Sequence, residues 1–231
     1  MREFSDSRQV KVVSSFTELA ESPFEGQQNA VCWARQPEGD FEALVHQLQL
    51  KDDVTEVSAE DLLKLNLSAA GSAARNTILN DLKCLKDFGA QPTLNLLKAY
   101  PRDDTFDFIS TDVYSFHVDR SPVAADTFLC TYYGAASDII ANEDVEQKVL
   151  LPEIRQKLAE IYDGDEGDFE DFLSDYFFDL HYQPKAGGAI VNLGVGHLWK
   201  LAVDYPGQAV LPCVHRAPLE KANELRLLLI C

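Results

Sequence analysis

A histidine and an aspartate stand two positions apart in the segment YSFHVDRSP, at His117 and Asp119. If this segment is a β-strand, both side chains project from the same face, because side chains alternate along a strand. An imidazole nitrogen and a carboxylate oxygen would then lie side by side, as two ligands of a metal ion do. A His-x-Asp pair also arises by chance in an acidic chain, so the assignment depends on further ligands elsewhere in the sequence.

A third ligand must come from one of the other histidines, and His215 is the best candidate. The segment VLPCVHRAP places it at the end of an expected strand, just before a turn marked by Pro218. Two histidines and one carboxylate on one face of a divalent ion leave coordination positions open, which suits non-haem Fe(II). We assign His46 to an amphipathic helix surface, and His181 lies in no recognisable motif. His197 either lines a cavity with Asn192 and Trp199 or stands at the edge of the core.

Three arginines could bind an anion near these residues. Arg226 lies in ELRLLLI, an expected strand that is otherwise aliphatic. Burying a guanidinium costs several kcal/mol unless an anion meets it, and its planar fork suits a carboxylate. Arg120 and Arg216 each directly follow a proposed ligand, so either one binds a substrate carboxylate or forms a surface ion pair.

The order of these residues resembles that of the Fe(II)- and 2-oxoglutarate-dependent dioxygenases: H-x-D, a distal histidine, and an arginine about ten residues later. More narrowly, the segments FHVDR, TFLCTYYG, VHRAP and RLLLI look like a little-characterised family of bacterial and fungal proteins. That family is catalogued as a domain of unknown function and is placed near those oxygenases. The resemblance covers roughly residues 95–231.

The resemblance implies a double-stranded β-helix, or jelly roll, with a catalytic Fe(II) held by His117, Asp119 and His215. Its implied activity is the oxidation of a small molecule by dioxygen, with 2-oxoglutarate as co-substrate. An amino acid or another carboxylate as substrate would account for the spare arginines, and Asn192 is a further candidate for substrate binding.

The resemblance also gives Arg226 a role, which is to bind the distal carboxylate of 2-oxoglutarate. Many such enzymes carry Ser or Thr two residues after this arginine, where this chain has Leu228. We therefore expect another hydroxyl, such as that of Tyr132, to share the carboxylate.

Two other functions remain open at this point. A cupin-like metalloenzyme or isomerase would use the same three ligands with zinc, manganese or iron and without an oxoacid. A non-catalytic metal-binding or sensing module would bind an ion or small ligand and would meet a protein partner through its acidic exterior. The residues leave the oligomeric state open.

The sequence around these residues shows two patterns, one typical of helices and one typical of strands, which together predict an α+β fold. Apolar residues recur at helical spacing from about residue 40 to 100, whereas β-type runs with Gly and Pro turns predominate from about residue 93. We expect a single domain over 1–231, with a mainly helical scaffold over 1–92 and a jelly-roll core over 93–231. A helical insertion is expected at about 143–180.

The composition limits the partners. The formal net charge of −18 gives nucleic acid and anionic membranes no electrostatic reason to bind. The five cysteines show no CxxC spacing and are odd in number, which indicates reduced thiols. No apolar run approaches the roughly 20 residues needed to cross a bilayer, and the first residues do not resemble a secretory signal. We therefore expect a cytoplasmic protein that does not bind membranes.

Overall fold

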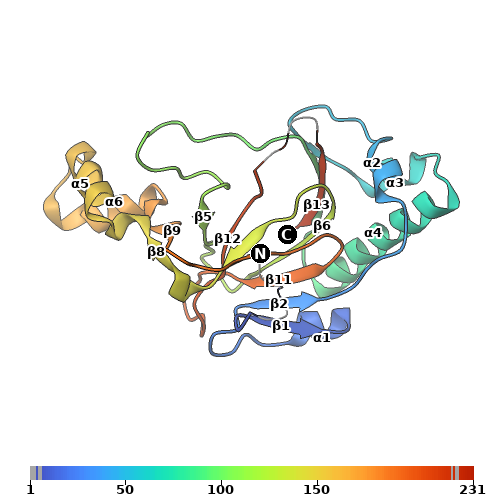
Figure 1. Ribbon diagram of the computed structural model, residues 1–231, viewed down its shortest axis with the longest axis horizontal. Helices are drawn as coiled ribbons and strands as arrows, with labels where there is room; N and C mark the ends of the chain where they lie inside the picture. The colour runs from blue at the N-terminus through green and yellow to red at the C-terminus, as the bar shows by residue number, and fades with distance from the viewer. Residues whose placement is uncertain (1–3, 5–6, 220, 222–223) are drawn as a thin grey trace.

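The computed structural model describes residues 4, 7–219, 221 and 224–231, and it is an α+β structure built on two β-sheets. The sheets lie in the middle of the molecule, and Figure 1 shows most of the helices at its two ends. The β-rich core expected from the sequence is therefore present. In the described part of the chain, no helix is both long enough and apolar enough to cross a membrane.

The larger sheet has seven strands in the order β1-β2-β11-β6-β13-β4-β3, and only β1 and β2 are parallel neighbours. Its strands are β1 (Val10–Val13), β2 (Ala30–Trp33), β3 (Val54–Glu56), β4 (Thr93–Leu97), β6 (Asp126–Tyr133), β11 (Leu198–Ala202) and β13 (Arg226–Ile230). The segment 1–92, expected to be mainly helical, thus supplies three strands as well. Each of these is only three or four residues long and carries little periodic signal.

The smaller sheet is antiparallel and has six strands in the order β10-β7-β12-β5-β9-β8. Its strands are β5 (Phe116–His117), β7 (Asp138–Ile140), β8 (Val145–Gln147), β9 (His181–Pro184), β10 (Ile190–Asn192) and β12 (Val214–Arg216). The expected metal ligands therefore belong to this sheet or directly follow one of its strands.

The two sheets pack against each other through one shared apolar cluster. Ile139 and Val191 enter it from the smaller sheet, and Leu129, Trp199 and Leu228 enter it from the larger sheet. Because side chains alternate along a strand, residues two positions from these members also face the space between the sheets. This space is called the inter-sheet space below.

Helices cover the outer face of the larger sheet. They are α1 (Phe16–Glu21), α2 (Phe41–Val45), α3 (Ala59–Lys64) and α4 (Ala69–Phe88). In α4 the buried residues Ile78, Leu82 and Leu85 recur at helical spacing and pack on the sheet, as the sequence predicts. The helix ends at Gly89, whose φ of 101° is the left-handed conformation that glycine adopts at low cost.

A second group of helices lies at the opposite end of the molecule from α4 (Figure 1). It comprises η3 (Lys148–Leu150), α5 (Pro152–Ile161), η4 (Glu166–Asp168), α6 (Phe169–Asp175) and η5 (Phe178–Leu180), while η2 (Asn142–Asp144) lies before it in the chain, between β7 and β8. These helices occupy the range expected for an insertion, and they enclose an apolar cluster of their own around Leu158, Leu173 and Phe178.

Candidate metal centre

His117 and His215 are directly opposite each other on the antiparallel strands β5 and β12. Their ring centroids are 4.5 Å apart. On its other side His215 is opposite Ile139, a member of the cluster between the sheets. Directly opposed residues project from the same face of a sheet, so both imidazoles face the inter-sheet space.

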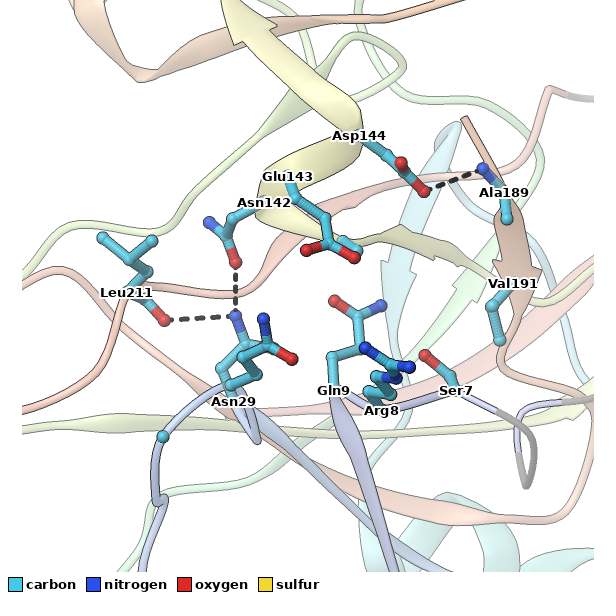
Figure 2. A pocket seen from close by; sticks show the side chains of 13 residues that line it. Ser7, Arg8, Gln9, Asn29, Asn142, Glu143, Asp144, Ala189, Val191 and Leu211 are labelled. Atoms are coloured by element: carbon cyan, nitrogen blue, oxygen red, sulfur yellow. Dashed lines mark hydrogen bonds between the residues drawn. The ribbon is translucent and has the colours of Figure 1, made fainter. Parts of the chain in front are cut away.

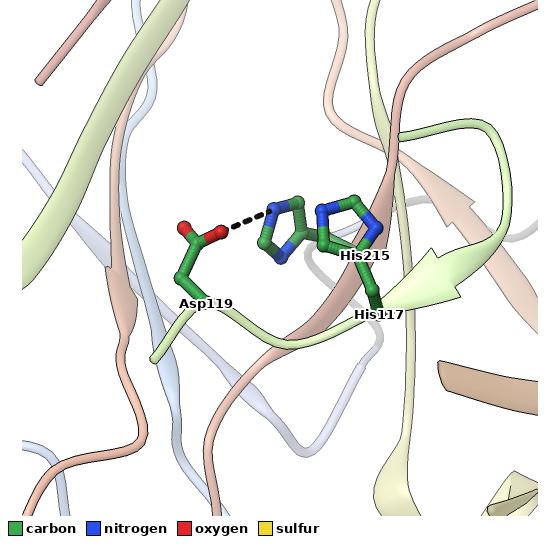
Figure 3. Close-up of side chains that lie close together, drawn as sticks. All are labelled: His117, Asp119 and His215. Atoms are coloured by element: carbon green, nitrogen blue, oxygen red, sulfur yellow. Dashed lines mark ion pairs between the residues drawn. The ribbon is translucent and has the colours of Figure 1, made fainter. Parts of the chain in front are cut away.

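Asp119 completes the group from the segment that follows β5 (Figure 3). Its Oδ1 lies 3.6 Å from Nε2 of His215, and its Oδ2 accepts a hydrogen bond from the hydroxyl of Thr127. Its backbone carbonyl accepts a hydrogen bond from the N–H of Asp204 at 2.8 Å. One ligand atom from each of the three expected ligands lies within 4.8 Å of the others. The structure thus brings together the residues that the sequence assigned to a metal.

Both imidazoles are held in the orientation that leaves Nε2 available. Nδ1 of His117 lies 2.8 Å from the carbonyl oxygen of Ser115, and Nδ1 of His215 lies 3.1 Å from that of Cys213. A carbonyl only accepts hydrogen bonds, so each Nδ1 carries the proton and each neutral ring keeps its lone pair on Nε2. Such second contacts orient histidine ligands in metal sites.

The electrostatics of the group favour neutral imidazole beside a carboxylate. Burial, together with the neighbouring His215, lowers the pKa of His117 to about 4. Burial alone would raise the pKa of Asp119, but His215 and the Thr127 hydroxyl hold it below its usual value. At neutral pH these two side chains are therefore in the forms that bind a cation.

His181 is a residue of this site that the sequence analysis missed. It is opposite His117 on the strand β9, so His215, His117 and His181 form a row across three strands. His181 is buried, and its Nδ1 has no hydrogen-bond partner in the described part of the chain. Burial lowers its pKa to about 3, followed by the effects of His117 and Lys148. No sequence motif marks it, because its position depends on strand register.

Arg226 is buried and faces the inter-sheet space, because it alternates with Leu228 of the shared cluster. Its Nη2 donates to the hydroxyl of Ser137 at 2.8 Å and to that of Thr131 at 3.1 Å. Among the described residues no carboxylate forms an ion pair with it, and its Nε has no partner. Burial lowers the pKa of Arg226 to about 10, so the guanidinium stays charged at neutral pH.

The structure corrects the expected role of Tyr132. Its hydroxyl donates to Oδ2 of Asp81 at 2.7 Å, and its ring stacks on Phe41 on the helix-covered face of the sheet. Asp81 in turn binds Arg35 through a hydrogen bond of 2.7 Å from Nη1 to Oδ1. Tyr132 is therefore part of a buried ion-pair network and points away from Arg226.

The expected substrate contacts are already engaged within the chain. Arg120 donates to Asp179 at 2.6 Å and to Asp204 at 3.1 Å. Arg216 donates to Asp138 at 3.0 Å and lies over the ring of Phe116.

Asn192 donates to the carbonyl of Ala136 at 3.0 Å and to Oδ1 of Asp138 at 2.9 Å. The ion-pair interpretation of Arg120 and Arg216 thus agrees with the geometry.

The remaining histidines lie outside the group. His46 is exposed at the end of α2. Nδ1 of His197 accepts a hydrogen bond from the backbone N–H of Arg35 at 3.0 Å, which makes His197 a structural residue at the edge of the sheet.

Comparison with known proteins adds one partial similarity. A ferrochelatase from Rhodopseudomonas palustris (strain HaA2) is 26% identical to this chain over 151 residues, which is 64% of this chain and 44% of the ferrochelatase. The chain therefore spans less than half the length of that relative, and at this identity the similarity does not establish a shared family or activity. No protein-family model matches the chain, and no solved structure matches it.

Proposed function

We propose that this chain is a non-haem Fe(II)- and 2-oxoglutarate-dependent oxygenase with a jelly-roll core that oxidises a small molecule with dioxygen. One observation carries the proposal. A compact His117, Asp119 and His215 group and a buried arginine without an acidic partner among the described residues face the same space between two sheets. The first feature suits an open-sided metal ion and the second suits a carboxylate.

The three ligand side chains suit a divalent ion in chemistry, and their ligand atoms lie within 4.8 Å of one another, close to the spacing that one ion bridges. Bonds from a divalent metal to imidazole nitrogen or carboxylate oxygen are about 2.1 Å long, so one ion bridges atoms up to about 4.2 Å apart. The Asp119 oxygen and the His215 nitrogen are 3.6 Å apart, and small side-chain rotations would bring the group around one ion. Two nitrogens and one oxygen leave further positions for an oxoacid and dioxygen.

Arg226 offers the second contact that an oxoacid needs. Its hydroxyl partner Ser137 directly precedes β7 and lies two positions before Ile139, which is opposite His215, so the arginine and the metal ligands border the same short segment. Leu228 has no hydroxyl to share the carboxylate of the oxoacid with Arg226. The hydroxyls of Thr131 and Ser137, which contact Arg226, would take that part. A cavity of about 30 Å³ is lined by Arg226 and Tyr100, among others, and has room for about one molecule the size of water. Binding of an oxoacid there therefore requires neighbouring side chains to move.

Within this proposal the chain's residues have separate tasks. His117, Asp119 and His215 would hold the ion, with their orientations fixed by Ser115, Cys213 and Thr127.

Bound Fe(II) and 2-oxoglutarate would supply the activation of dioxygen, with the oxoacid converted to succinate and carbon dioxide. Arg226 would neutralise the distal carboxylate and so fix how the oxoacid reaches the ion. The shared apolar cluster would exclude water from the space behind them.

A shallow cavity of about 550 Å³ beside Asp119 is the candidate for the substrate. Arg120 and Ser121 line it from the segment after Asp119, and Phe177 and Tyr205 line it from two other segments. Phe177 is exposed and has a φ of 60°, which is uncommon for a residue with a side chain and frequent near functional sites. Because Arg120 is already neutralised by two aspartates, the substrate needs no carboxylate there.

The decisive experiment is anaerobic absorption spectroscopy. Fe(II) and 2-oxoglutarate added together should give a weak visible charge-transfer band, and Asp119→Ala should abolish it. Succinate formed under air with a library of small molecules then identifies the substrate. Stoichiometric metal without a band or succinate would instead support an enzyme without an oxoacid or a non-catalytic metal-binding module.

A further inference from the structure

A larger cavity, of about 570 Å³, lies where the starts of β1 and β2 approach η2 and β10. Among the described residues that line it there is no member of the metal centre. Gln9 and Asn29, which directly precede β1 and β2, contribute to one wall, and Asn142, Glu143 and Asp144 contribute from the opposite side (Figure 2). The volume is within the range of about 300–1,000 Å³ typical of small-molecule sites.

Gln9 and Asn29 are neighbours because β1 and β2 are parallel. Val10 is opposite Ala30 in the ladder, and the backbone N–H of Asn29 donates to the carbonyl of Gln9 at 3.1 Å. Residues at corresponding positions of adjacent strands project from the same side. Two carboxamide side chains therefore stand together in this wall of the cavity.

These carboxamides have hydrogen-bonding groups that nothing in the described chain satisfies. Gln9 is 4% exposed, and neither its Nε2 nor its Oε1 has a partner. Asn29 is 2% exposed, and its Oδ1 has no partner. A buried group without a hydrogen bond is costly and uncommon in native proteins. Three such atoms in one cavity wall therefore indicate a ligand that completes them.

The orientation of Asn29 is fixed by its neighbours. Its Nδ2 donates to Oδ1 of Asn142 at 2.7 Å and to the carbonyl of Leu211 at 3.1 Å. Both of these atoms are acceptors in this arrangement, so turning the amide over would place an oxygen against them. The unsatisfied set is therefore one N–H₂ donor, from Gln9, and two carbonyl acceptors, from Gln9 and Asn29.

A primary carboxamide is the complement of this set. Its carbonyl would accept from Nε2 of Gln9, and its two N–H groups would donate to Oε1 of Gln9 and Oδ1 of Asn29. A carboxylate in the same place would accept from Nε2 of Gln9 but would bring no donor to the two carbonyls. The charged residues at the cavity bear on the rest of the ligand, because Glu143 and Asp144 favour an ammonium group and Arg8 favours an acid group.

From this arrangement we propose that the cavity is a second binding site, specific for a small molecule that carries a primary carboxamide, such as an amino-acid amide. The site is independent of the metal centre and of the proposed oxygenase activity. Figure 2 shows the Gln9 carboxamide facing the side chain of Glu143. Glu143 is exposed, so rotation of this side chain would uncover the amide for the ligand.

Matched pairs of ligands test the proposal on the full chain by thermal unfolding. The pairs are L-glutamine with L-glutamate, L-asparagine with L-aspartate, and nicotinamide with nicotinate. At ten times its dissociation constant an amide member should raise the Tm by about 3–6 °C, while its acid partner should leave the Tm unchanged. The proposal is overturned if no amide raises the Tm at 10 mM, or if amide and acid act equally.

A variant and a control separate specific binding from general effects. Gln9→Met keeps the length of the side chain but removes the amide, so it should unfold at the same or a higher temperature than the wild type and lose the response to glutamine. Gln156→Met, at an exposed position of α5, should keep the full response. A response that survives Gln9→Met contradicts the assignment.

Nuclear magnetic resonance tests the wild-type chain directly, whatever the behaviour of the variant. The side-chain N–H₂ signals of Gln9 should shift on addition of glutamine and remain in place with glutamate. Unchanged Gln9 signals in the presence of a bound amide would also contradict the proposal.

Discussion

His117 is directly opposite His215 on β12 and, on its other side, directly opposite His181 on β9. The register of β5 against β12 therefore determines the candidate metal centre, and the register of β9 against β5 places His181 beside it. A slip of one residue in either pairing would turn an imidazole to the other face of the sheet.

Removal of a single ligand should abolish tight metal binding. We expect His117→Ala, Asp119→Ala and His215→Ala each to weaken divalent-metal affinity by at least about 100-fold, because two remaining ligands hold an ion poorly. Titration calorimetry with Mn(II) or Co(II) under nitrogen measures the affinity. The exposed His46→Ala is the matched control and should bind as the wild type does. Wild-type affinity in any of the three variants would exclude that residue as a ligand.

Arg226→Met should separate binding of the oxoacid from binding of the metal. We expect at least about a 100-fold loss of 2-oxoglutarate affinity with unchanged metal affinity, because a charge-assisted contact is lost. The variant should also unfold at no lower urea concentration than the wild type, since it removes a buried cation that lacks an acidic partner among the described residues. A markedly destabilised variant with intact oxoacid binding would show that Arg226 is structural.

The hydroxyls beside Arg226 should contribute less than the arginine itself. Ser137→Ala and Thr131→Val each remove one neutral hydrogen-bond partner, so each should weaken 2-oxoglutarate binding by about tenfold. Equilibrium dialysis of the Fe(II)-loaded protein measures the effect. If both variants bind as the wild type does, Arg226 does not act together with these hydroxyls.

Tyr132→Phe should lower the stability of the protein and leave its affinity for 2-oxoglutarate unchanged. The change removes a hydrogen bond to the buried Asp81, which should lower the free energy of unfolding by about 1–3 kcal/mol. Urea denaturation measures this loss, and Tyr133→Phe on the same strand is the matched control. A loss of 2-oxoglutarate affinity in Tyr132→Phe would restore the role that the sequence suggested for this residue.

His181 should make stability depend on pH. Its folded pKa of about 3 is below the unfolded value of about 6.5, so the unfolded chain binds the proton more readily. The stability is therefore fully present above about pH 6.5 and falls as the pH decreases toward 3. Between pH 7 and pH 5 this residue should account for a loss of about 2 kcal/mol.

Urea denaturation across this pH range tests the prediction. His181→Gln should show a smaller loss between pH 7 and pH 5 than the wild type, and His46→Gln is the matched control. An unchanged pH profile in His181→Gln would contradict the burial argument.

The sequence by itself identified the chemical types and the principal segments of this protein. His117-x-Asp119 predicts two ligands on one face, and the strand-end position of His215 supplies the third, which the structure brings to the same place. The helical spacing in α4 and its stop at Gly89 are likewise local properties. Such features are readable because they depend on residues a few positions apart.

Only the tertiary structure decided which side chains of β6 pack on the helices and which face the inter-sheet space. Six consecutive residues of this strand are buried, so its sequence shows no polar face and no phase of alternation. The sequence alone therefore does not predict that Tyr132 faces the helices and that Thr131 faces Arg226. His181 joins the site for a similar reason, because the pairing of β5 with β9 is a long-range contact that no local pattern encodes.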